Sequence, residues 1–98
     1  MARGNIERIR NSIRRRQYDM SAHAMEEMAE DNLDIEDVEC SILKGSLVRV
    51  ERGDPRGTKY VLTGAAVDAI TPVGSVGRFT STERYLIVTV YEITDPND

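Results

Sequence analysis

The run Tyr85-Leu86-Ile87-Val88-Thr89-Val90-Tyr91 is the clearest strand in this chain of 98 residues. Its β-branched and aromatic side chains favour extended backbone. Apolar side chains fall on both of its faces, a pattern typical of a strand that is covered, or nearly covered, on both sides. We therefore predict a strand over residues 84–93 in the middle of a sheet, with the rest of the domain built around it.

Further strands are expected upstream of this run. The turn between the first two is Asp54-Pro55-Arg56-Gly57, which has the residues that a type I turn prefers. Pro72, Gly74 and Gly77 interrupt the third, so we expect it to be bulged or broken, with a loop. The expected strands span residues 47–51, 59–63 and 68–79.

Helical periodicity dominates the chain before residue 45. Ser21 and Asp34 are suitable N-caps for two of the helices, and Gly45 is a suitable stop. The expected helices span residues 5–16, 22–31 and 35–44.

These elements predict an α+β fold in which N-terminal helices pack on one face of a four-stranded, mostly antiparallel sheet. The length fits a single domain over residues 1–98. Within it we distinguish a basic N-terminal helix (1–17), a core (18–93) and a tail (94–98).

Composition excludes several classes of site. One cysteine, Cys40, and one histidine, His23, provide neither an internal disulfide nor a structural zinc site, and nothing points to a cofactor. The sequence has no apolar run long enough to cross a bilayer and no stretch resembling a signal peptide, so we expect a cytoplasmic protein with no membrane partner.

The net charge of −4 is unevenly distributed. Residues 1–16 contain six arginines and one acid, whereas residues 19–39 contain nine acids and no Lys or Arg. The basic helix could contact nucleic acid or a membrane surface. It could equally lie against the acidic helices of its own fold, which we favour because an acidic chain is a poor general binder of nucleic acid.

His23 is the first candidate for chemistry. It falls at the second position of the helix capped by Ser21, beside unpaired backbone N–H groups and the positive end of the helix dipole. That field favours a neutral imidazole, which could act as a general base on a phosphate-bearing substrate. Four nearby acids oppose the field: Glu26, Glu27, Glu30 and Asp31. Alternatively, His23 only packs the first helical turn.

Polar residues on the predicted strands could complete a site. An imidazole, a guanidinium and a phenol can cleave RNA without a metal, because the base takes the 2′-hydroxyl proton and the cation stabilises the phosphate. We predict His23, Arg56 and Tyr91 as catalytic residues. The predicted substrate-binding residues are Lys59, Tyr60 and Thr89. The same residue types also occur as turn, core-edge and strand residues with no such role.

The order of these segments resembles the domain-of-unknown-function 4258 family of small bacterial and archaeal proteins. The resemblance covers roughly residues 18–93 and rests on Ser21-Ala22-His23-Ala24, Met28, Ile35, Asp37-Val38, Gly45, Asp54-Pro55-Arg56-Gly57, Lys59-Tyr60 and the strand ending Val88-Thr89-Val90-Tyr91. The family is similar in architecture to RelE- and BrnT-type toxins, which are metal-free endoribonucleases neutralised by antitoxins. The resemblance thus implies a RelE-like fold, RNA as substrate and an antitoxin or other protein partner. A homo-oligomer is also compatible with it.

This sequence departs from the family pattern beside His23. Family members usually carry arginine at two positions of that helix, where this chain has Glu27 and Asp31. If those arginines contact RNA, this face binds RNA poorly. The departure favours an alternative function, a non-catalytic protein-interaction module on the same scaffold.

Overall fold

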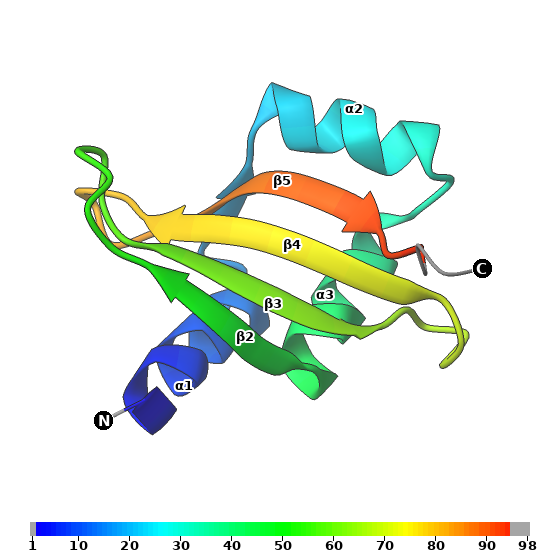
Figure 1. Cartoon of the computed structure of the whole chain (residues 1–98), viewed down its shortest axis with the longest axis horizontal. Helices are drawn as coiled ribbons and strands as arrows, with labels where there is room; N and C mark the ends of the chain where they lie inside the picture. The colour runs from blue at the N-terminus through cyan, green and yellow to red at the C-terminus, as the bar shows by residue number, and fades with distance from the viewer. Residues whose placement is uncertain (1, 95–98) are drawn as a thin grey trace.

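The computed structural model describes residues 2–94, and only the backbone of residues 2 and 3. Its elements are α1 (Ala2–Arg14), β1 (Tyr18–Met20), α2 (Ala22–Glu30), α3 (Ile35–Lys44), β2 (Ser46–Glu51), β3 (Lys59–Ala65), β4 (Pro72–Phe79) and β5 (Tyr85–Glu92). The strands form one sheet in the order β1-β5-β4-β3-β2 (Figure 1). The predicted α+β class is confirmed. Of the predicted tail, residues 95–98 lie outside the described residues.

The prediction of four strands is wrong, because the sheet has five. The additional strand, β1, pairs in parallel with the first half of β5, with Tyr18 opposite Tyr85 and Met20 opposite Ile87. The other three pairings are antiparallel. Three residues are too few to show the alternation that identifies a strand in a sequence.

The third predicted strand is more regular than expected. β4 runs unbroken over eight residues and pairs with both β3 and β5. Its glycines make room for tyrosine rings, since a Cβ at Gly74 would lie 2.3 Å from the ring of Tyr91, and one at Gly77 would lie 2.4 Å from that of Tyr85. The register between β4 and β5 shifts where Val76 and Gly77 pair with Thr89 and Ile87, but the extra residue is Val88 of β5, so the bulge lies in the neighbouring strand and not in the predicted one.

The local signals for caps and turns are confirmed. Ser21 Oγ accepts a hydrogen bond from the backbone N–H of Ala24 at 3.0 Å, and Gly45 ends α3. The Gly57 N–H donates to the Asp54 carbonyl at 2.9 Å, as a type I turn requires. The helices differ from their predicted ranges only at their ends, by at most three residues, at the start of α1.

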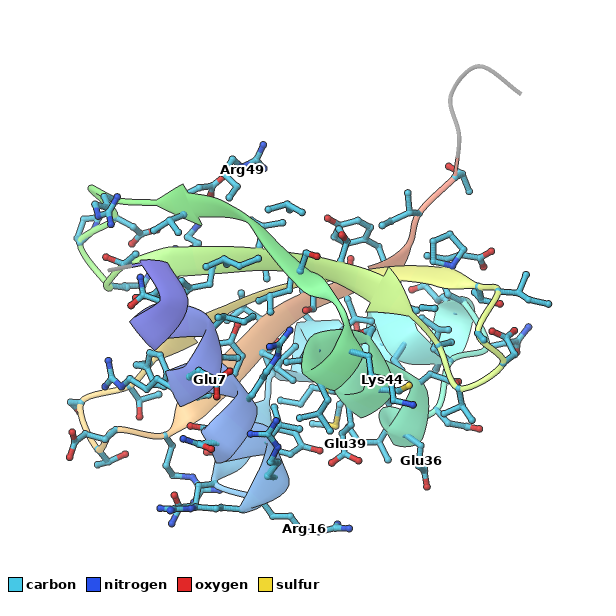
Figure 2. All side chains as sticks on the ribbon, turned by 90° about the horizontal axis from the view of Figure 1, so that it is seen from below. Glu7, Arg16, Glu36, Glu39, Lys44 and Arg49 are labelled. Atoms are coloured by element: carbon cyan, nitrogen blue, oxygen red, sulfur yellow. The ribbon has the colours of Figure 1, made fainter. Side chains whose placement is uncertain are left out.

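Helices α1 and α3 cover one face of the sheet, and their apolar sides build the core with the side chains of that face (Figure 2). Helix α2 differs, because it lies along the edge of the sheet beside β5 (Figure 1). The expectation that all helices pack on one face is therefore correct only for α1 and α3. The buried core residues include Ile9, Ile13, Val38, Ile42, Leu62, Val73, Tyr85, Ile87 and Val90.

Two arginines of the basic helix α1 are engaged within the fold. The guanidinium of Arg8 lies over the ring of Phe79, 3.8 Å from its centroid. Arg10 donates to the carbonyl oxygens of Gly45 at 2.7 Å and Ile42 at 3.4 Å, at the C-terminal end of α3, where a cation also complements the helix dipole. Helix α1 thus packs on α3, but these two arginines bind a ring and backbone carbonyls and not the acidic side chains of α2 or α3.

The opposite face of the sheet carries no helix among the described residues, and Figure 1 looks onto it directly. We call it the open face. Alternation and cross-strand pairing place its side chains, and Arg49 points away from α1 and α3 in Figure 2. Its members include Asp19 of β1, Arg49 and Glu51 of β2, Lys59, Val61 and Thr63 of β3, Gly74, Val76 and Arg78 of β4, and Leu86, Thr89 and Tyr91 of β5.

Candidate functional site

His23 occupies the second position of α2, as predicted, and 67% of its side chain is exposed. Its Nε2 atom lies 3.3 Å from Glu27 Oε1, one helical turn further on. Met28 packs against the core, on the flank of α2 that faces α1 and α3. At 100° per residue, His23 and Glu27 fall on the other flank, which borders the open face.

Glu27 also binds the neighbouring strand. Its Oε1 accepts a hydrogen bond from the backbone N–H of Val90 at 3.1 Å, and Asp31 Oδ2 accepts one from Glu92 at 2.9 Å. Ser21 Oγ donates to the carbonyl of Val88 at 3.1 Å. Beyond β1, the side chains of α2 thus take the place of a strand along the edge of β5.

We call these hydrogen bonds between α2 side chains and the edge of β5 the α2 seal. The α2 seal gives a physical reason for the two acids, Glu27 and Asp31, that depart from the family pattern. A backbone N–H needs an acceptor, and a guanidinium has none. Arginine at position 27 or 31 could not bind Val90 or Glu92 as these carboxylates do. Sequence reasoning noticed both acids and missed their role, because nothing local reveals that α2 runs beside β5.

Two of the predicted site residues, Thr89 and Tyr91, lie on the open face next to α2. Both are half-buried. The ring of Tyr91 extends across Gly74, its partner on β4. Because Glu27 binds both His23 and the N–H of Val90, it connects the imidazole to the strand segment between these two side chains.

The predicted cations lie elsewhere, at the hairpin between β2 and β3. Asp54 binds both, with Oδ2 3.2 Å from Lys59 Nζ and Oδ1 3.5 Å from Arg56 Nε. The Arg56 backbone N–H and the Lys59 ammonium hold the pKa of the Asp54 carboxyl at about 2. β3 lies two strands from β5, about 10 Å at ordinary strand spacing, and α2 lies beyond β5. The fold therefore separates both cations from His23.

Tyr60 points away from the open face. It is 8% exposed, belongs to the core and packs edge-on against Phe79 with ring centroids 6.0 Å apart. Tyr60 was predicted to bind substrate, but its side chain lies in the core. Strand alternation explains the placement, because its neighbours Lys59 and Val61 face the other way.

Sequence reasoning missed Arg78, a half-buried cation on the open face. It pairs with Leu86 of β5 and donates to the backbone carbonyl of Arg56 at 3.5 Å. No acidic side chain among residues 2–94 forms an ion pair with it. Its strand was expected to be bulged or broken, so its orientation could not be read from the sequence.

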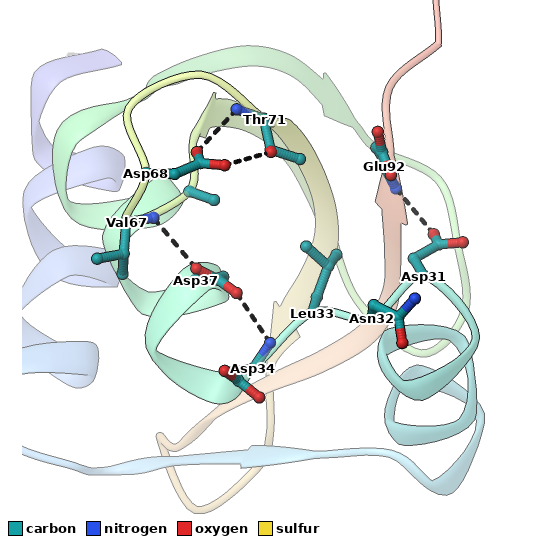
Figure 3. A pocket seen from close by; sticks show the side chains of 10 residues that line it. Asp31, Asn32, Leu33, Asp34, Asp37, Val67, Asp68, Thr71 and Glu92 are labelled. Atoms are coloured by element: carbon teal, nitrogen blue, oxygen red, sulfur yellow. Dashed lines mark hydrogen bonds between the residues drawn. The ribbon is translucent and has the colours of Figure 1, made fainter.

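A depression is lined by five acids, and three of them, Asp31, Asp37 and Asp68, accept hydrogen bonds within the fold (Figure 3). Asp37 accepts from the N–H groups of Asp34 and Val67, and Asp68 accepts from the N–H groups of Ile70 and Thr71. They act as loop and helix caps. Within residues 2–94, no group of three or more His, Cys, Asp or Glu side chains could hold a metal ion.

None of the helices in residues 2–94 combines the length and apolarity needed to span a bilayer.

Comparison with known proteins identifies one relationship. Residues 20–92 match the family described as Domain of unknown function (DUF4258). No curated protein and no solved structure matches the chain. The match begins just before the Ser21 cap of α2 and ends with β5, so it contains the open face apart from Asp19, the α2 seal and most of the core. The chain belongs to the domain-of-unknown-function 4258 family.

Proposed function

We propose that this protein is a non-catalytic protein-interaction module whose partner docks on the open face. The observation that carries the proposal is the dispersal of the predicted catalytic and substrate-binding residues. His23 lies on α2, Arg56 lies at a hairpin tip beside Asp54, and Tyr60 lies in the core.

The open face itself supports docking. A strand with apolar side chains on both faces is typical of a strand buried on both sides. β5 meets that condition on its inner face only, and Leu86 and Tyr91 remain half-buried on the open face beside Val76 of β4. A protein partner would complete their burial.

The test uses the protein encoded beside this one as the first partner to try. The two chains are co-expressed, and their complex is measured by size-exclusion chromatography. Leu86→Lys should abolish the complex, because it replaces an apolar side chain of the open face with a charge. Ile70→Lys is the matched control, since Ile70 is 82% exposed in a loop away from that face. Equal binding by both variants would contradict the proposal.

A second function, a RelE-like metal-free ribonuclease, is favoured by the pairing of His23 with Glu27. A carboxylate that holds an imidazole can orient it as a general base. In this proposal Tyr91 and Thr89 position the RNA, and Arg78, which pairs with Leu86 of β5, replaces Arg56 as the cation.

The ribonuclease is tested with purified protein and RNA in the presence of EDTA. Cleavage by the wild type that His23→Ala removes and Met25→Ala retains would establish it; Met25 is a matched control because it is half-exposed on the same helix. Equal cleavage by wild type and His23→Ala, or none by either, would remove His23 from any catalytic role.

A further inference from the structure

The charges around the open face divide it into two halves. The hairpin formed by β2 and β3, with the adjoining part of β4, carries five cations against two acids. The cations are Arg49, Arg52, Arg56, Lys59 and Arg78, and the acids are Glu51 and Asp54. At the other side of the sheet, α2 and its C-cap together carry four acids and no Lys or Arg: Glu26, Glu27, Glu30 and Asp31. The two halves lie on opposite edges of the sheet (Figure 1).

Between the halves the open face carries apolar side chains. Val61, Val76 and Leu86 lie on three consecutive strands, and beside Val76 the ring of Tyr91 covers Gly74. Val61 is only 4% exposed because its neighbours on the face surround it. Such a centre permits the close approach of a second sheet, as in a two-layer sandwich.

We propose that the open face binds a second copy of this chain, face to face, so that the basic half of each copy covers the acidic α2 of the other. This rests on the proposed function and names its partner. A two-fold axis along the strands, in the plane of the interface, turns β2 of one copy onto α2 of the other. The charge pattern is therefore self-complementary in this arrangement.

The size of the face sets the strength of the dimer. Four strands at ordinary spacing and about seven residues in length cover roughly 450 Å² per copy, or roughly 900 Å² for the pair. The lower limit for a specific interface is near 1,000 Å². The side chains of α2 add to the contact. We therefore expect a concentration-dependent dimer and not a permanent one.

The first measurement is the mass of the full chain by sedimentation equilibrium across a wide concentration range. The monomer has a mass of 11.0 kDa, and the wild type should approach twice that value at high concentration. Leu86→Lys should remain monomeric, whereas Ile70→Lys should behave as wild type. A wild type that stays at 11.0 kDa throughout would overturn the inference.

The second measurement tests the charge halves directly. Arg49→Glu with Arg52→Glu changes the net charge of the hairpin half from +3 to −1, and Glu26→Lys with Glu30→Lys changes that of the α2 half from −4 to zero, so that in either variant like charges meet at the substituted positions. Each double variant alone should dimerise at least about tenfold more weakly, because like charges then face each other. An equimolar mixture should restore the dimer as a heterodimer, which native mass spectrometry identifies by mass. Circular dichroism checks that both variants fold.

Mixing the two double variants distinguishes complementary charge halves from misfolding. A variant weakened by misfolding would not be rescued by the other one, whereas complementary halves require rescue. A mixture that associates no better than its components overturns the second copy as partner. In that case, a complex with the neighbouring gene's product that Leu86→Lys still abolishes would leave the proposed function standing.

Discussion

The two faces of β5 have similar sequences and different surroundings. Tyr85, Ile87 and Val90 point inward and are fully buried, whereas Leu86 and Tyr91 point to the open face and are only half-buried. Apolar side chains on both faces thus identify a strand that can be covered on both faces, and the monomer covers only the inner face. The uncovered face holds apolar area that only another molecule can remove from water.

The largest expected effect is on stability, and it distinguishes two neighbouring residues of β5 that point to opposite faces of the sheet. Ile87→Ala should lower the free energy of unfolding by about 2–5 kcal/mol, because it leaves a cavity in the core. Leu86→Ala on the open face should cost about 1 kcal/mol or less. Denaturant unfolding at low protein concentration, where the chain is monomeric, compares the two. Equal losses would show that the open face is covered within the monomer.

The glycines of β4 provide the next comparison. Gly77→Ala should lower stability by about 1–3 kcal/mol, because its Cβ would meet the ring of Tyr85, which is fully buried and cannot move. Gly74→Ala should cost less, since the ring of Tyr91 can swing away from the open face into solvent. Thermal unfolding of both variants measures the difference, and a larger loss for Gly74→Ala would reverse this interpretation.

The edge of β5 allows a test in which only one acceptor changes. Glu27→Ala removes the acceptor for the Val90 N–H and should cost about 1–2 kcal/mol. Amide exchange at Val90 should accelerate. Glu27→Gln keeps an acceptor oxygen and should preserve most of the protection. If Val90 exchanges equally fast in both variants, the α2 side chain does not seal this edge.

Much of the fold could be predicted from local signals. The Ser21 cap, the Gly45 stop, the Asp54–Gly57 turn and the 85–91 strand all depend on a few adjacent residues, and the structure has each of them. The errors concern relations between distant segments. β1 forms because its backbone pairs with the free edge of β5. β4 stays continuous because tyrosine rings from β5 cover its glycines.

The candidate site was harder to predict for the same reason. Residue type selected His23, Arg56, Lys59, Tyr60, Thr89 and Tyr91, but topology decides which of them share a face. Thr89 and Tyr91 come together next to α2, whereas Tyr60 turns into the core and the two cations bind Asp54. Arg78 reaches the open face from a strand whose regularity the sequence concealed.

The smallest expected effect is at the hairpin that borders the open face. Its Asp54 carboxyl has a pKa of about 2, below its ordinary value of 3.8, because the Arg56 N–H and the Lys59 ammonium stabilise the charged form. A depressed pKa stabilises the fold above about pH 4, and this contribution disappears as the pH falls toward 2. The carboxyl lies at the surface, so the change in global stability should be slight.

A titration followed by NMR of the Asp54 side chain should give a midpoint near 2 in the wild type. Lys59→Ala should raise that midpoint toward 3.8, whereas Arg49→Ala, which removes a hairpin cation that pairs with Glu51 instead, should leave it unchanged. A wild-type midpoint near 3.8 would mean that Asp54 does not hold Lys59, and that this cation is free to serve the open face.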